Sequence, residues 1–125
     1  MNELKFDAAS RTLFVVIDQD WTVEELRAFK AVFAETVLKH GSPERPIGVL
    51  LDARLQAVQS QDVAAQFAGY PASVTAAIHA SAIVVGSILQ KLQADRTVGS
   101  EAVKVCMDLD EARAFLADRI SGLAA

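Results

Sequence analysis

Residues Val103 to Leu116 read VKVCMDLDEARAFL, an apolar run that passes directly into an amphipathic segment opening at Asp108. Earlier in the chain, the apolar run from Ala82 to Val85 is followed in the same way by Ser87. Both runs have the length of strands and lead into residues that favour helix N-termini, so each segment predicts a buried strand followed by a helix. Strands that are apolar on both faces and alternate with helices form parallel sheets covered on two sides. These stretches therefore predict an α/β fold.

The first part of the chain predicts a β-hairpin. Lys5 and Phe6 indicate a short edge strand, and Asp7 to Ser10 indicates a turn. The strand that follows, Thr12 to Asp18, contains a continuous apolar and β-branched run, which is typical of a strand inside a sheet.

A long helix and a third strand are expected next. Thr22 and Glu25 have the spacing of a capping box, and His40 with Gly41 marks the end of the helix. Its core stripe has helical spacing and consists of Leu26, Phe29, Phe33 and Val37. The apolar stretch from Ile47 to Asp52 predicts the strand after it.

The remaining elements complete an order of β-β-α-β-α-β-α-β-α. Between Ser60 and Ala80 the pattern predicts two short helices with a bend at Gly69 to Pro71. Ser87 with Gln90 predicts a second capping box, opening a helix from Ile88 to Asp95, and a last strand follows from Val103 to Met107. Asp108 with Glu111 is expected to cap the final helix, whose inner face is Leu109, Ala112, Phe115, Leu116 and Ile120. We predict one mixed, mainly parallel five-stranded sheet with helices on both faces, forming a single domain over residues 1–125.

Composition narrows the class of protein. The chain has 125 residues, of which 52% are hydrophobic and 22% charged, as expected for one folded domain. Its net charge of -4 and the lack of a basic cluster argue against nucleic-acid binding. The lone Cys106, the absence of a signal-peptide pattern at the start and the absence of an apolar run of about 20 residues predict a cytoplasmic protein without a membrane span. Cys106 is expected to be a core residue.

The order of elements and three motifs resemble the STAS family, the sulfate-transporter and anti-sigma-factor-antagonist domains, and most closely its small stand-alone bacterial members. The motifs are WTVEELRAF, SAIVVGS and VKVCMDLDEARAFL, which together span most of the chain. The resemblance implies a small mixed sheet with helices on both faces. It also implies a regulatory role in binding proteins, nucleotides or lipids, without catalysis and without a cofactor.

The resemblance also directs attention to Ser60. Family members that act as phospho-switches carry a phosphorylatable Ser after an Asp at the start of a helix, so that added charge changes partner docking. The corresponding stretch here is QAVQSQDVAAQF, in which Ser60 is followed by Gln61 and Asp62 and the Asp-Ser pair is absent. Ser60 is therefore either a switch or a plain helix N-cap.

The segment FVVIDQDWT gives an alternative function. An apolar strand followed by Asp-x-Asp-x-Thr resembles the nucleophile motif of haloacid-dehalogenase-like phosphatases, which implies a magnesium-dependent phosphatase with Asp18 as nucleophile and Asp20 as acid and base. The additional groups that such an enzyme needs would be Ser87, Lys91 or Lys104, Asp108 and Asp110. Asp18 and Asp20 are equally typical of a turn that closes a buried strand.

The carboxyl ends of parallel strands are the usual place for ligands. The polar and small residues expected there are Asp18, Asp20, Asp52, Arg54, Gly86, Ser87 and Asp108. Asp18, Asp20 and Asp108 are candidate metal ligands at this edge, although carboxylates at helix N-termini also serve as caps. Ser87 is the candidate for contact with an anion.

Apolar residues supply the other candidate surface. Trp21 precedes the first helix, where it is either a hydrophobic staple or an exposed contact. The broken segment from Val63 to Ile78 suits a cover over a pocket for an apolar or lipid-like molecule, or a patch that forms a homodimer. The ligand or partner surface is therefore predicted to include Trp21, Ser60, Phe67, Tyr70, Val74 and Ser87. The partner, the ligand and the oligomeric state are left open by the sequence.

Overall fold

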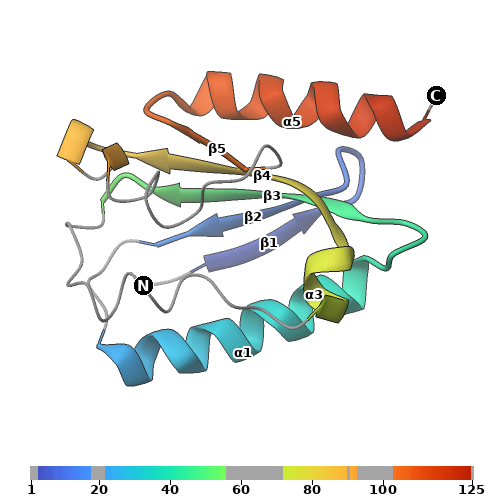
Figure 1. Ribbon diagram of the computed structural model, residues 1–125, viewed down its shortest axis with the longest axis horizontal. Coiled ribbons are helices and arrows are strands. Elements are labelled where there is room, and N and C mark those ends of the chain that lie inside the picture. The colour runs from blue at the N-terminus through green and yellow to red at the C-terminus, as the bar shows by residue number, and fades with distance from the viewer. Residues whose placement is uncertain (1–2, 18–21, 56–71, 90, 93–102, 125) are drawn as a thin grey trace.

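A five-stranded sheet with helices on both faces organises the chain (Figure 1). The computed structural model describes residues 3–17, 22–55, 72–89, 91–92 and 103–124. The strands are β1 (Glu3–Asp7), β2 (Thr12–Val16), β3 (Ile47–Ala53), β4 (Ile78–Val85) and β5 (Val103–Cys106), and the helices are α1 (Val23–His40), α3 (Ala72–Ala76) and α5 (Leu109–Ala124). The strand order is β1-β2-β3-β4-β5, with β1 antiparallel to β2 and all other neighbours parallel. The predicted mixed, mainly parallel sheet is confirmed.

Two apolar layers lie on opposite faces of the sheet. Alternate residues of β2 and its extension, Leu13, Val15 and Ile17, are fully buried and belong to the same core cluster as α1. The predicted α1 stripe of Leu26, Phe29, Phe33 and Val37 is buried in that cluster. On the other face α5 packs over β3, β4 and β5 and buries Ala112 and Leu116. In Figure 1, α1 and α5 accordingly lie on opposite sides of the sheet.

The ends of α1 are fixed as its sequence predicts. The Glu25 backbone N donates to the Thr22 hydroxyl at 3.2 Å, and the Thr22 backbone N donates to the Glu25 carboxylate at 3.1 Å. This reciprocal pair satisfies two backbone donors that an uncapped helix leaves without partners. At the other end, the Gly41 backbone N donates to the Val37 carbonyl at 2.8 Å.

The start of β4 corrects one prediction. The sequence predicted a helical face as far as Ile78 and a strand from Ala82, whereas β4 already begins at Ile78. Its residues pair with the whole of β3, and Ala80 and Ala82 are buried in the cluster beneath α5. Alanine favours helices over strands, so strand pairing and the close approach of α5 override the local preference. A helix is present just before this point, but it is only the short α3.

The start of α5 corrects part of another prediction. The Asp108 carboxylate accepts a hydrogen bond from the Asp110 backbone N at 3.1 Å, so Asp108 caps the helix as predicted. Glu111, expected to complete the capping box, places its carboxylate 3.1 Å from the Lys104 ammonium. The cation on the adjacent strand attracts the carboxylate more effectively than the neutral backbone donor.

Candidate functional site at the carboxyl edge of the sheet

The parallel strands β2 to β5 all end at one side of the sheet, called the carboxyl edge below (Figure 1). It comprises the last residues of these strands and the described residues that follow them, in the ranges 52–55, 86–89, 91–92 and 107–111, together with the first turn of α1. Because neighbouring strands are spaced about 4.8 Å apart, residues far apart in the sequence come together here. Ligand sites in parallel sheets usually form at this side.

An ion pair between Asp52 and Arg54 occupies the end of β3. The Arg54 guanidinium donates through Nε at 2.9 Å and through its terminal nitrogen at 2.8 Å to the two carboxylate oxygens of Asp52. The Arg54 backbone N donates to the same carboxylate at 3.2 Å. These hydrogen bonds favour the charged form, so the pKa of Asp52 lies below its ordinary value and the pKa of Arg54 lies above its own. The guanidinium is thus already bound by a carboxylate of its own chain.

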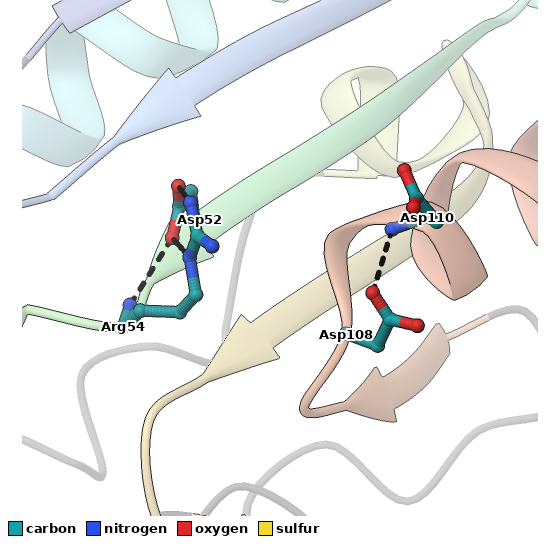
Figure 2. Close-up of polar contacts among 4 residues, drawn as sticks. All are labelled: Asp52, Arg54, Asp108 and Asp110. Atoms are coloured by element: carbon teal, nitrogen blue, oxygen red, sulfur yellow. Dashed lines mark hydrogen bonds and ion pairs between the residues drawn. The ribbon is translucent and has the colours of Figure 1, made fainter.

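Asp108 contributes to the same electrostatic environment from the start of α5. Figure 2 shows Asp52 and Arg54 at the end of β3 and Asp108 with Asp110 at the start of the helix. After the hydrogen bond and charge of Asp52, the negative charge of Asp108 also acts to raise the pKa of Arg54. Arg54 therefore experiences the fields of two carboxylates.

A shallow depression lies beside this ion pair. It has a volume of about 220 Å³ and is lined by Val16, Ile17, Asp52, Arg54 and Leu55. Cavities that enclose drug-sized ligands measure roughly 300–1,000 Å³. The described part of the depression is therefore smaller than a site that would enclose such a molecule.

Exposed apolar side chains are concentrated at the carboxyl edge. Those with the largest exposed fractions are Leu55 at 77%, Ile88 at 69% and Leu89 at 63%. Leu92 at 49% and Met107 at 45% lie in the same edge, whereas Val32 and Leu38 lie on α1. Leu55, Ile88, Leu89, Leu92 and Met107 follow three neighbouring strands and are called the edge apolar patch below. A concentration of this kind marks an interaction surface more often than isolated exposed residues do.

The edge apolar patch was not identified from the sequence. Its signal was available in Ile88, Leu89 and Leu92, because adjacent apolar residues in a short helix cannot all face one core. For Leu55 and Met107 the sequence carries no such signal, since an apolar residue after a strand fits a buried extension equally well.

The structure describes only some of the predicted site residues, and it places those in different parts of the fold. Asp18, Asp20, Trp21, Ser60, Phe67 and Tyr70 lie outside the described residues, as does Gln90 of the second capping box. Val74, predicted to be part of a surface, is 1% exposed and belongs to the core cluster beneath α1. Ser87 lies at the carboxyl edge, and its carbonyl accepts a hydrogen bond from the Lys91 backbone N at 3.0 Å, which closes a helical turn.

The phosphatase hypothesis depends on Asp18 and Asp20, which lie outside the described residues, so it stays a prediction. The ends of β2 and β5 are separated by β3 and β4, a distance of three strand spacings or roughly 14 Å. Within the described ranges, no group of three His, Cys, Asp or Glu side chains is placed to hold a metal ion.

Cys106 is a core residue, as predicted. It is 3% exposed, and its thiol lies 3.8 Å from the Ile83 carbonyl. Burial, followed by the nearby charge of Glu111, raises the pKa of this thiol. A buried thiol that resists ionisation is a poor nucleophile.

A solved structure with a similar fold is known. An uncharacterized protein of the DUF3478 family from Shewanella loihica PV-4, described as having a SpoIIAA-like fold, superposes with a TM-score of 0.61. The two share 15% sequence identity over 93% of this chain and 92% of that one. The chain thus has a SpoIIAA-like fold, the fold of anti-sigma-factor antagonists and STAS domains predicted from its motifs. No protein-family model and no curated protein matches the sequence.

No helix in the described part of the chain combines the length and the apolar character that crossing a bilayer requires.

Proposed function

We propose that the chain is a non-catalytic regulatory domain that binds a protein partner through the carboxyl edge of its sheet. The observation that carries this proposal is the edge apolar patch. Five large apolar side chains that follow three adjacent strands are costly to leave in water, and burying each one against a partner is favourable by about 1.5–3 kcal/mol when the burial is complete.

Two features support binding over catalysis. Arg54 and Asp52 hold each other in a bidentate pair, so neither group is poised to activate a substrate. The Cys106 thiol is buried, and its pKa is raised, which disfavours the thiolate. The SpoIIAA-like fold agrees with a regulatory role.

The shape of the edge favours a protein partner over an apolar small molecule. A small apolar ligand is usually enclosed, and most of its surface is removed from water. The described depression is open and small, whereas the edge apolar patch projects outward from the ends of β3, β4 and β5. An outward apolar surface with a polar rim is typical of a protein interface.

The test is affinity capture from a lysate of the native host with matched variants. Leu89→Asp places a charge in the edge apolar patch, and Leu38→Asp places the same charge on an exposed apolar position of α1. We expect the wild type and Leu38→Asp to retain the same protein and Leu89→Asp to lose it, as judged by mass spectrometry. Equal retention by both variants would contradict the proposal.

Light scattering on the purified chain distinguishes a self-association surface from a surface for another protein. A homodimer at micromolar concentration that Leu89→Asp dissociates would show that the edge binds a second copy.

A further inference from the structure

The depression beside the Asp52–Arg54 ion pair has room for one aromatic side chain. Its volume is about 220 Å³, and a protein cavity of about 150 Å³ is already large enough to bind benzene. Leu55 belongs both to the lining of the depression and to the edge apolar patch. A protein that covers the patch therefore also reaches the depression.

Apolar side chains form most of the described lining. Val16 and Ile17 come from the end of β2, and Leu55 follows β3, the neighbouring parallel strand. The ion pair at the end of β3 supplies the polar part (Figure 2). A lining of this composition favours an occupant that removes apolar surface from water.

The ion pair disfavours a charged occupant. Asp52 and Arg54 are bound to each other at 2.8 and 2.9 Å, so the pair is neutral as a whole and each charge is satisfied within the chain. An incoming cation or anion would lose hydration and would have to displace one member of the pair to regain a counter-charge. We therefore expect a neutral occupant.

The fixed guanidinium plane favours an aromatic occupant over an aliphatic one. The two parallel hydrogen bonds to Asp52 use one edge of the Arg54 guanidinium and not its faces, and 45% of the side chain is exposed. Arginine stacks on aromatic rings through these faces, and the contact is stabilising. The chain makes the same kind of contact elsewhere, because the Arg119 guanidinium carbon lies 5.1 Å from the centroid of the Phe115 ring.

We propose that the depression is the anchor site for one aromatic side chain of the protein partner, which contacts Val16 and Leu55 and stacks on the Arg54 guanidinium. This inference rests on the proposed function and specifies the chemistry of the partner. Aromatic side chains that fill pockets of this kind carry much of the binding energy in protein interfaces.

Four capped amino-acid amides test the preference. The N-acetyl amides of tryptophan, leucine, lysine and glutamate are titrated into the intact, isotopically labelled chain, and NMR follows the backbone amide signals. We expect the tryptophan amide to shift the signals of residues 16–17 and 52–55 and to bind at least about threefold more tightly than the leucine amide. The lysine and glutamate amides, which keep their side-chain charges, are expected to leave these signals unchanged.

Matched variants test the two kinds of contact. Arg54→Lys keeps the charge and removes the plane, so it is expected to weaken binding of the tryptophan amide about two- to fivefold. Arg45→Lys makes the same change in the loop before β3 and is expected to have no effect. Leu55→Ala is expected to weaken binding about threefold, and Leu38→Ala, at an exposed position of α1, to leave it unchanged. The dispersion of the amide signals confirms that each variant is folded.

The outcomes separate the two proposals. No binding of the tryptophan amide at residues 16–17 and 52–55, equal binding of the tryptophan and leucine amides, or unchanged binding in Arg54→Lys would overturn the aromatic-anchor inference. The proposed function would still stand if affinity capture identified a partner that depends on Leu89. If the captured partner did not depend on Leu89, the proposed function would fall, whichever amide binds.

Discussion

The two edges of the sheet are built differently, although the same strands end at both. The amino edge, comprising the turn at 8–11, the loop at 41–46 and Ala77, is closed by internal hydrogen bonds. The Arg11 guanidinium donates to the Arg45 carbonyl at 2.8 Å, and the Ile47 backbone N donates to the Ala77 carbonyl at 2.9 Å. The carboxyl edge instead exposes the edge apolar patch.

Further contacts strengthen the amino edge. The Ser10 hydroxyl donates to the Asp7 carboxylate at 2.6 Å, and the rings of Phe6 and His40 stack with their centroids 4.2 Å apart. Such contacts satisfy polar groups within the chain and offer little to a partner. One edge of the sheet therefore serves stability, and the other is available for recognition.

The largest expected effect is on the free energy of unfolding, and it is tested by shortening one aliphatic side chain at each edge. Ile47→Ala removes a fully buried side chain at the start of β3 and should reduce the free energy of unfolding by about 2–4 kcal/mol. Leu55→Ala, just beyond the end of the same strand, should change it by less than about 0.5 kcal/mol because Leu55 is 77% exposed. Urea denaturation measures both, and similar losses would contradict the difference between the edges.

A second pair tests how tightly the amino edge is packed. A Cβ atom at Gly41 would lie 3.0 Å from the Ala77 carbonyl oxygen and 3.1 Å from an Ile47 side-chain carbon. That carbonyl is fixed by its hydrogen bond, so Gly41→Ala should destabilise the chain by about 1–2 kcal/mol. At Gly48 the nearest atom is 3.4 Å away, an ordinary contact, so Gly48→Ala should cost less than about 0.5 kcal/mol. A Gly41→Ala variant as stable as the wild type would show that the loop has room.

The helix cap at the carboxyl edge should contribute a smaller amount. Thr22→Ala removes the hydroxyl that accepts from the Glu25 backbone N and should cost about 1 kcal/mol. Thr36→Ala is the control, because the Thr36 hydroxyl only donates to the Val32 carbonyl within the helix and alanine favours the helix more. In thermal denaturation, the melting temperature of Thr22→Ala should lie well below that of Thr36→Ala. The reverse order would refute the capping role.

The smallest expected effect is a pH dependence at the ion pair. The hydrogen bonds from Arg54 lower the pKa of Asp52 below the ordinary carboxyl value of 3.8. The contribution of this ion pair to the free energy of unfolding is therefore complete above pH 3.8 and is lost as the pH falls through the lowered pKa. Asp52→Asn should flatten the acid limb of the stability curve and leave its slope at neutral pH unchanged.

The same measurement on Asp7→Asn compares the two edges. The pKa of Asp7 is also lowered, chiefly by the Ser10 hydroxyl, so this variant should flatten the acid limb too. An unchanged acid limb in both variants would mean that neither contact persists in solution.

Most of the fold could be predicted from local patterns. The capping box at Thr22 and the core stripe of α1 depend on residues within one helix, so their spacing is sufficient. The early start of β4 at Ile78 could not be predicted, because it depends on pairing with β3 and on burial of Ala80 and Ala82 beneath α5. Glu111 was misassigned for a similar reason, since its partner Lys104 lies on a different element.

The candidate site was less predictable than the fold. Asp52, Arg54, Ser87 and Asp108 were correctly expected at one edge, because the carboxyl ends of parallel strands coincide. The exposure of apolar side chains was harder to predict. An apolar residue such as Leu55 is expected in the core unless its neighbours in space are known. Trp21, Ser60, Phe67 and Tyr70 stay predictions.

A perturbation map of backbone amide signals tests the difference between the edges most directly. The isotopically labelled chain is titrated with the protein that affinity capture identifies, and NMR follows each amide. The largest changes are predicted in the ranges 53–55, 86–89 and 107–111, with the amino-edge residues 8–11 and 41–46 unchanged. Changes concentrated at the amino edge, or on the outer face of α1 around Val32 and Leu38, would contradict the assignment of recognition to the carboxyl edge.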